Sequence, residues 1–116
     1  HVVDGNLDAV LLSEQAEHFS HRQLIVDFAQ NAKLPTMTTF VEIVDVGGLI
    51  AYGSDRLEQF RYLATCVDKI LRGMDPTGIP ILLVTNFHLA INLKTAKSLR
   101  LAIPPSLLAR ADILIE

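Results

Sequence analysis

Several features that would indicate a class of protein are scarce in this 116-residue chain. It has a single cysteine, Cys66, which excludes a disulfide framework and a cysteine metal site. The formal net charge is -3, and no block or stripe of basic residues is present, which makes nucleic acid an unfavourable partner. The longest apolar runs, such as residues 79–84, are too short to cross a bilayer.

The remaining composition is that of a folded domain. Half of the residues are hydrophobic, and acids and bases are mixed along the chain. This composition excludes a disordered chain, and 116 residues suffice for a single core. No internal repeat or low-complexity segment is visible. We therefore expect residues 1–116 to form one domain.

Strand-like and helical segments alternate along the sequence. Short apolar or β-branched runs predict strands at residues 9–12, 36–38, 49–52 and 87–92, with 79–84 as an extended edge segment. Helical spacing or capping signals predict helices within residues 20–34, 40–46, 54–72 and 93–99, with Ser20 and Asn92 as caps at two helix starts and Gly73 at a helix end. This alternation is typical of an α/β fold, in which a short parallel sheet is flanked by helices in three layers, as in Rossmann-like domains.

One glycine-containing segment invites an enzymatic interpretation. Residues 44–48 read Val-Asp-Val-Gly-Gly, which resembles the first motif of S-adenosylmethionine-dependent methyltransferases. The third glycine of that motif is absent, and no helix follows the turn at once. We interpret Gly47 as the end of a helix that leads into a strand.

The histidines and serines give no support to a metal site or to catalysis. His18 and His21 are three residues apart, but only Glu14 and Glu17 are nearby acids, so we interpret both as solvated residues around a helix start. Ser13 follows a strand without the flanking glycines of a hydrolase elbow. We predict no catalytic residue, no metal and no cofactor.

Binding has more support, because polar residues follow three predicted strands. In an open parallel sheet, ligands lie beyond the carboxyl ends of the strands. Here these ends carry three groups of candidate ligand-binding residues: Ser13, Glu14 and Gln15; Thr38, Thr39 and Phe40; Tyr52, Ser54 and Asp55. Nearby helix starts offer free N–H groups to an anion, and the two aromatic rings offer a flat apolar wall. The alternative that Thr39 and Ser54 serve only as helix caps stays open.

The C-terminal part of the chain is the most distinctive. Residues 92–97 read Asn-Leu-Lys-Thr-Ala-Lys, and residues 103–112 read Ile-Pro-Pro-Ser-Leu-Leu-Ala-Arg-Ala-Asp. Together with 46–53 and 67–73, they resemble the ABC transporter substrate-binding proteins of the tryptophan or sugar type, which have two Rossmann-like lobes. Arg100 stands where the family is expected to carry glycine. We expect residues 87–116 to form a strand, a helix and a terminal helix that begins at Pro-Pro, with Leu107, Leu108 and Ile113 on one apolar stripe.

The resemblance implies a fold and a role. The fold is one lobe of the type I periplasmic-binding-protein kind, as a C-terminal fragment of a longer receptor. The role is to capture a small solute, such as an amino acid or small carboxylate, between two lobes that close about a hinge. The implied partners are the N-terminal lobe, an ABC permease and an ATPase. The implied location is periplasmic, or extracytoplasmic with a lipid anchor.

Two further expectations complete this interpretation. An isolated lobe that lacks its first strand and helix has an open sheet edge, which predicts a homodimer or segment exchange through that edge. A flavodoxin-like regulatory domain and, less favoured, a small S-adenosylmethionine-binding enzyme are the alternative functions. The first lacks an acidic phospho-acceptor pocket, and the second lacks a complete glycine turn.

Overall fold

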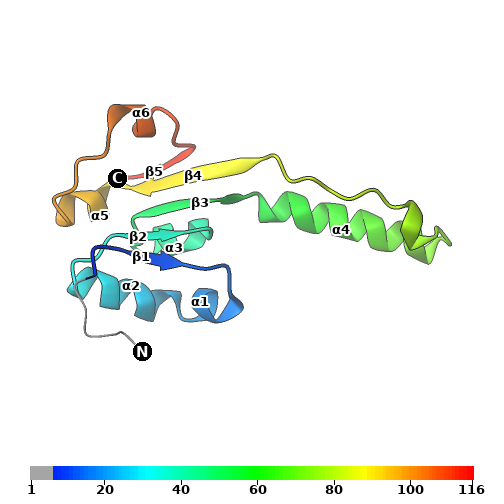
Figure 1. The fold of residues 1–116 in the computed structure, drawn as a ribbon, viewed down its shortest axis with the longest axis horizontal. Coiled ribbons are helices and arrows are strands. Elements are labelled where there is room, and N and C mark those ends of the chain that lie inside the picture. The colour runs from blue at the N-terminus through cyan, green and yellow to red at the C-terminus, as the bar shows by residue number, and fades with distance from the viewer. Residues whose placement is uncertain (1–6) are drawn as a thin grey trace. The chain divides into compact units, whose positions relative to one another are not determined.

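The computed structural model describes residues 7–116, which form an α/β fold (Figure 1). The strands are β1 Val10–Leu12, β2 Thr36–Thr38, β3 Ile50–Ser54, β4 Phe87–Asn92 and β5 Ile113–Ile115. The helices are α1 Ala16–Ser20, α2 Arg22–Asn31, α3 Val41–Asp45, α4 Arg56–Leu71, the 3-10 helix η1 Pro76–Gly78, α5 Leu93–Ser98 and α6 Pro105–Leu108. A turn expected at Gly5 and Asn6 lies outside the described residues.

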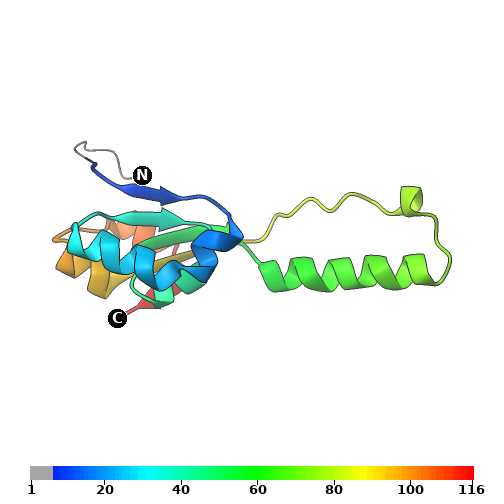
Figure 2. The ribbon, with the colours of Figure 1, turned by 90° about the horizontal axis from the view of Figure 1, so that it is seen from below.

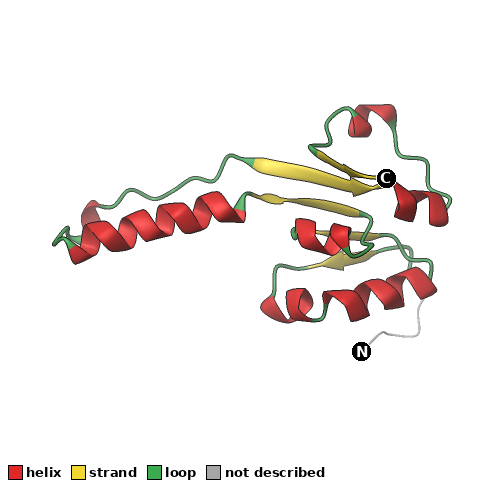
Figure 3. Cartoon of the chain, turned by 180° about the vertical axis from the view of Figure 1, so that it is seen from behind, coloured by secondary structure: helices red, strands yellow, loops and turns green. Residues whose placement is uncertain are grey.

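The strands form one sheet in the order β1-β2-β3-β4-β5. Strands β1, β2 and β3 are mutually parallel, and β4 is parallel to β5. The arrows of β4 and β5 point against those of β1 and β2 (Figures 1 and 3). The expected α/β fold, a sheet flanked by helices, is therefore confirmed, and its parallel strands fall into two sets of opposite direction.

The chain divides into two compact units. The larger unit comprises residues 1–53 and 88–116, and the smaller unit comprises residues 54–87. The sequence predicted a single domain and gave no signal of this division. The two units are described separately below.

The larger unit has a well-packed core. Helices α1 and α2 run along β1 and β2 (Figures 1 and 2), and their apolar sides meet α3. One cluster of buried residues comes from β1, α2, α3 and the residue before α3: Leu12, Val26, Ile43 and Phe40. A second comes from α3, β3 and β4: Val44, Ala51 and Ala90. Helix α3 contributes to both clusters, so this five-residue helix joins the two halves of the core.

Some helices begin or end at the capping residues that the sequence predicts, and others begin or end a few residues away. Ser20 was expected to begin a helix, but it ends α1, and His21 precedes α2. Asn92 begins α5 as predicted, with its side-chain oxygen accepting a hydrogen bond from the backbone N–H of Thr95 at 3.0 Å. Arg100 takes the left-handed conformation (φ 56°) that a glycine would favour, so α5 ends in the usual way without one.

The C-terminal segment ends in a strand, which the sequence pattern did not predict. Ile113 was expected to share an apolar stripe with Leu107 and Leu108, but it begins β5, where it pairs with Ala90 of β4. Asp112 fixes this pairing, because its backbone N–H donates to the Leu89 carbonyl and its carboxylate accepts from the Leu89 N–H at 2.8 Å.

The smaller unit consists of α4, η1 and an extended segment. Helix α4 contains no buried residue. Gly73, with φ 94°, ends it as the sequence predicted. The Tyr62 hydroxyl donates to the Pro80 carbonyl at 2.6 Å, which ties the helix to the extended segment. The pKa of Tyr62 is raised above its ordinary value, mainly by partial desolvation and to a smaller extent by the neighbouring Cys66 thiol.

Candidate functional site

Three of the predicted site residues lie in a row across the end of the sheet. The strand register aligns Leu12 with Thr38 and Thr38 with Ala51. The next residues along the three strands are Ser13, Thr39 and Tyr52, which we call the strand-end row. The short strands and their register thus bring together residues that are 26 and 13 positions apart in sequence.

The β1 end of this row is a tight exposed loop. The Ser13 carbonyl accepts hydrogen bonds from the Gln15 backbone N–H and from Nδ1 of His18, both at 2.9 Å. The ring therefore donates from Nδ1, which fixes its tautomer at this contact. Glu14 and Gln15 are exposed beside it. Polar side chains with the capacity to meet a polar solute therefore face solvent here.

The β2 end differs because it is largely buried. Thr38 is 1% exposed, and its hydroxyl accepts from the Phe40 backbone N–H. Phe40 is 5% exposed, and its ring lies 5.5 Å from that of Phe19, so it packs in the core and forms no exposed wall. The hydroxyl of Thr39 is buried and has no hydrogen-bond partner within residues 7–116. A buried hydroxyl without a hydrogen-bond partner destabilises the folded state. Thr39 therefore stands out in the strand-end row as a residue whose hydroxyl is available to a ligand.

The backbones of β2 and β3 approach closely at this edge. A Cβ atom at Gly53 would collide with the carbonyl oxygen of Thr39. Glycine is therefore required for close packing of the strand ends, since no side chain fits there. Tyr52, the neighbour of Gly53, is 46% exposed and is the accessible aromatic residue of the row.

Ser54 and Asp55 belong to the smaller unit, where both contact α4. The Ser54 hydroxyl accepts from Nε2 of Gln59 at 2.7 Å. Asp55 begins the helix, with its carboxylate accepting from the Glu58 backbone N–H at 3.0 Å. The cap is thus one residue later than the predicted Ser54. A carboxylate already occupies this helix start, which disfavours an anionic ligand group there.

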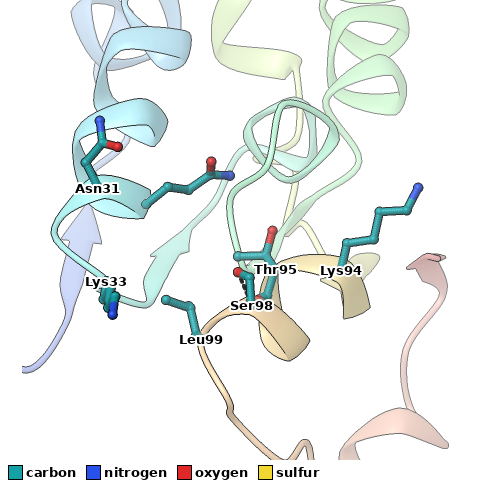
Figure 4. Close-up of a pocket in the computed structure, with 7 residues that line it drawn as sticks. Asn31, Lys33, Lys94, Thr95, Ser98 and Leu99 are labelled. Carbon is teal, nitrogen blue, oxygen red and sulfur yellow. Dashed lines mark hydrogen bonds between the residues drawn. The ribbon is translucent and has the colours of Figure 1, made fainter.

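A pocket that the sequence did not predict lies between the end of α2 and α5 (Figure 4). It has a volume of about 430 Å³, and Lys33 and Lys94 contribute to its lining. Several of its polar groups are already engaged: Nε2 of Gln30 and the Thr95 hydroxyl both donate to the Gly47 carbonyl, at 3.1 and 2.9 Å. These bonds tie α2 and α5 to the turn after α3, so the polar lining serves the fold.

The turn at Gly47 also settles the interpretation of the glycine-containing segment. Val46 ends α3, and Gly47 has φ 109° before the chain enters β3. A Cβ at Gly48 would lie 2.8 Å from the Ile43 carbonyl oxygen. The glycines therefore form the predicted helix end leading into a strand.

His18 and His21 both contact the backbone. His21 donates from Nδ1 to the Glu17 carbonyl at 2.9 Å, one turn back along the chain. Within residues 7–116, no group of three or more histidine, cysteine, aspartate or glutamate side chains is placed to hold a metal ion. No helix in the same range is long and apolar enough to span a membrane.

With this geometry in hand, comparison with known proteins identifies the family. The family model for ABC transporter substrate-binding proteins matches residues 1–115. The chain belongs to that family. No curated protein gives a significant match.

Solved structures of the same architecture agree with the family. A conserved domain protein from Vibrio cholerae O1 biovar El Tor is similar with a TM-score of 0.86 and 25% identity, over 92% of this chain and 36% of the other. An ABC domain from Streptococcus pneumoniae, solved in complex with L-Trp, gives a TM-score of 0.85 and 25% identity, over 95% and 38%. An open, ligand-free substrate-binding protein from Clostridium difficile shares the fold alone, with a TM-score of 0.64 and 17% identity over 97% and 37%.

The chain thus spans a little over a third of the length of the solved proteins that it matches. The resemblance derived from the C-terminal residues of the sequence is confirmed. So is the binding-protein fold that it implied.

Proposed function

We propose that this chain is part of the solute-binding component of an ABC import system. It captures a small molecule of the amino acid or small carboxylate type and delivers it to a membrane permease and its ATPase. The observation that carries the proposal is the family match over residues 1–115. The complex of the Streptococcus pneumoniae relative with L-Trp supports an amino acid as the ligand class. The proposed role is transport without catalysis, in a periplasmic or lipid-anchored extracytoplasmic receptor.

The strand-end row is the proposed binding edge. Ser13 follows β1, Thr39 follows β2, and Tyr52 lies beside them in the carboxyl-terminal half of β3, at the edge where α/β sheets bind ligands. The exposed Tyr52 ring offers an apolar surface, and the buried Thr39 hydroxyl offers a hydrogen bond that the fold itself does not use. Within the larger unit, Glu14 and Gln15 are further proposed ligand-binding residues, and Thr38 and Phe40 hold the edge in place. Ser54 and Asp55, in the smaller unit, stay predictions from the sequence.

Calorimetric titration of the full-length protein with L-Trp, other amino acids and small carboxylates tests the proposal. We expect one of these solutes to bind, and Tyr52→Ala to weaken its binding by about 10-fold or more through loss of the aromatic contact. The matched control is Tyr62→Ala, because Tyr62 bonds only within the smaller unit and should leave the affinity unchanged. Binding of a nucleotide or S-adenosylmethionine, with none of the solutes binding, would overturn the proposal.

A further inference from the structure

The pocket between the end of α2 and α5 lies within the larger unit, away from the strand-end row (Figure 4). Helix α2 ends at Asn31 and the chain enters β2 at Thr36, so this side of the pocket is at the amino end of β2. Helix α5 follows the carboxyl end of β4, which runs against β2. The strand-end row lies beyond the carboxyl end of β2. The pocket is therefore separate from the proposed solute-binding edge.

This pocket is cationic, although the chain has 13 acidic residues against 10 basic ones. The described residues that line it include Lys33 and Lys94 and no acid. Neither ammonium group forms a hydrogen bond or an ion pair within residues 7–116. An anion in the pocket would thus meet two positive charges that the described chain does not neutralise.

Local helix structure explains these two lysines only in part. Lys94 lies in the first turn of α5, where a helix favours acidic over basic side chains. Lys33 follows the end of α2, which suits a cation, but it takes the left-handed conformation (φ 55°) that glycine favours. Arg100 has the same conformation (φ 56°) after α5 and does not line the pocket. Arg100 therefore provides a matched control for Lys33.

The uncharged polar residues of the pocket divide into donors and acceptors. Nε2 of Gln30 donates one N–H to the Gly47 carbonyl, and the Asn31 amide makes no hydrogen bond within residues 7–116, so both retain N–H groups. The Thr95 hydroxyl donates to the Gly47 carbonyl, and the Ser98 hydroxyl donates to the Thr95 carbonyl at 2.8 Å (Figure 4). Both hydroxyls have therefore used their protons, and their oxygens can only accept.

From this arrangement we propose that the pocket binds a small phosphomonoester that carries free hydroxyl groups. Two ammonium groups balance the charge of a phosphomonoester, which is about -2 at neutral pH. A lysine ammonium is a compact point charge that suits phosphate, whereas the planar arginine fork that pairs best with a carboxylate is absent from the described lining.

The rest of the pocket fits the rest of such a ligand. The amide N–H groups of Gln30 and Asn31 complete the contacts to phosphate, and the oxygens of Thr95 and Ser98 accept from the hydroxyls of the ligand. Leu99 offers an apolar wall to its carbon atoms. The volume of about 430 Å³ lies within the range of small-molecule sites.

Phosphorus-31 NMR of glycerol 3-phosphate with the full-length protein tests the proposal, because the signal reports on the phosphate itself. At a pH of about 8, where the phosphate is a dianion, we expect a saturable shift of the signal with a Kd of about 1 mM or lower. Succinate should compete about 10-fold less well, since the pocket lacks an arginine fork. No binding at about 10 mM ester, or equal competition by succinate, would refute the proposal.

Two substitutions with matched controls locate the binding. Lys33→Asn, which keeps a residue that tolerates the left-handed conformation, and Lys94→Gln should each weaken binding by about 5-fold or more. Arg100→Asn and Lys97→Gln make the same changes after and on α5 but outside the lining, and they should change the affinity by less than about 2-fold. Equal weakening by all four variants would reveal general charge attraction, which contradicts a site in this pocket.

The inference does not depend on the proposed function, and one variant separates the two. Tyr52→Ala, which is expected to weaken solute binding, should leave the affinity for glycerol 3-phosphate unchanged. Loss of ester binding in Tyr52→Ala, with full binding in Lys33→Asn and Lys94→Gln, would place the ester at the strand-end row and exclude the pocket. Ester binding that depends on the lysines, in a protein that binds none of the transport solutes, would support the pocket and remove the transport role.

Discussion

The two units of this chain use similar apolar residues with opposite results. In the larger unit, Ile43, Val44 and Ile91 are each 0% exposed. In the smaller unit, α4 is the longest helix of the described residues, and its apolar stripe is as regular as a core-facing stripe should be, yet none of its 16 residues is buried.

The difference lies in what stands opposite each apolar surface. The strands of the larger unit are covered by α1, α2 and α3, so two layers enclose apolar side chains between them. The smaller unit has one α-helix, one short 3-10 helix and one extended segment, which cannot enclose a core. Periodicity therefore identifies the side of a helix that will be buried, but it does not show whether the covering element belongs to the same unit.

The sharpest test of this contrast truncates one apolar side chain in each unit. In the 116-residue chain, Ile43→Ala should lower the free energy of unfolding by about 2–5 kcal/mol, because it opens a cavity in a packed core. Val67→Ala should lower it by less than about 0.5 kcal/mol, because Val67 is 55% exposed. Urea unfolding followed by circular dichroism measures both values.

The contrast between the two units would be contradicted if Val67→Ala lowered the free energy of unfolding of the 116-residue chain as much as Ile43→Ala does. That result would mean that the apolar stripe of α4, formed by Leu57, Phe60, Ala64, Val67 and Leu71, is already covered in solution. Repeating the measurement over a range of protein concentrations would then show whether self-association covers it, since such stability depends on concentration.

Local features of the fold were predictable from the sequence. The alternation of strands and helices, the start of α5 at Asn92 and the end of α4 near Gly73 all depend on residues close together in the chain. The glycine turn at Gly47 was likewise interpreted correctly, because the missing third glycine and the following strand are visible locally.

Features that depend on distant contacts were not predictable. Strand β5 is three residues long and exists through its pairing with β4, so the pattern around Ile113 suggested a helix instead. The division into two units depends on which contacts form across the chain. In the site, the strand-end positions followed from the sequence, but the burial of Phe40 did not, because it results from packing against Phe19.

The helix starts offer a second comparison between the units. Asn92 is 4% exposed, and its amide donates to the Val44 carbonyl at 3.0 Å while its oxygen caps α5. Asn92→Ala removes both bonds and leaves the Val44 carbonyl without this donor, so we expect a loss of about 2–3 kcal/mol. Asp55→Ala removes the α4 cap and should cost about 1 kcal/mol or less, because the freed Glu58 N–H is exposed to water.

Asn92→Asp refines this test in the same urea experiments. Aspartate keeps the oxygen that accepts from the Thr95 N–H but loses the amide that donates to Val44. Stability between those of the natural protein and Asn92→Ala would separate the two roles. If Asn92→Ala and Asp55→Ala lowered the free energy of unfolding equally, the burial of the cap would not explain how much each cap stabilises the protein.

The smallest expected effect concerns the turn after α4, where Asp75 accepts hydrogen bonds from the hydroxyl and the backbone N–H of Thr77 at 2.6 and 2.8 Å. These bonds lower the pKa of Asp75 below its ordinary value. Their contribution to the turn is therefore complete above pH about 3.9 and is lost as the pH falls through the folded pKa. An NMR titration of the Asp75 carboxyl carbon should give a midpoint below about 3.9, and Thr77→Val, which keeps only the backbone donor, should raise it. An unchanged midpoint in Thr77→Val would show that the hydroxyl does not hold this turn in solution.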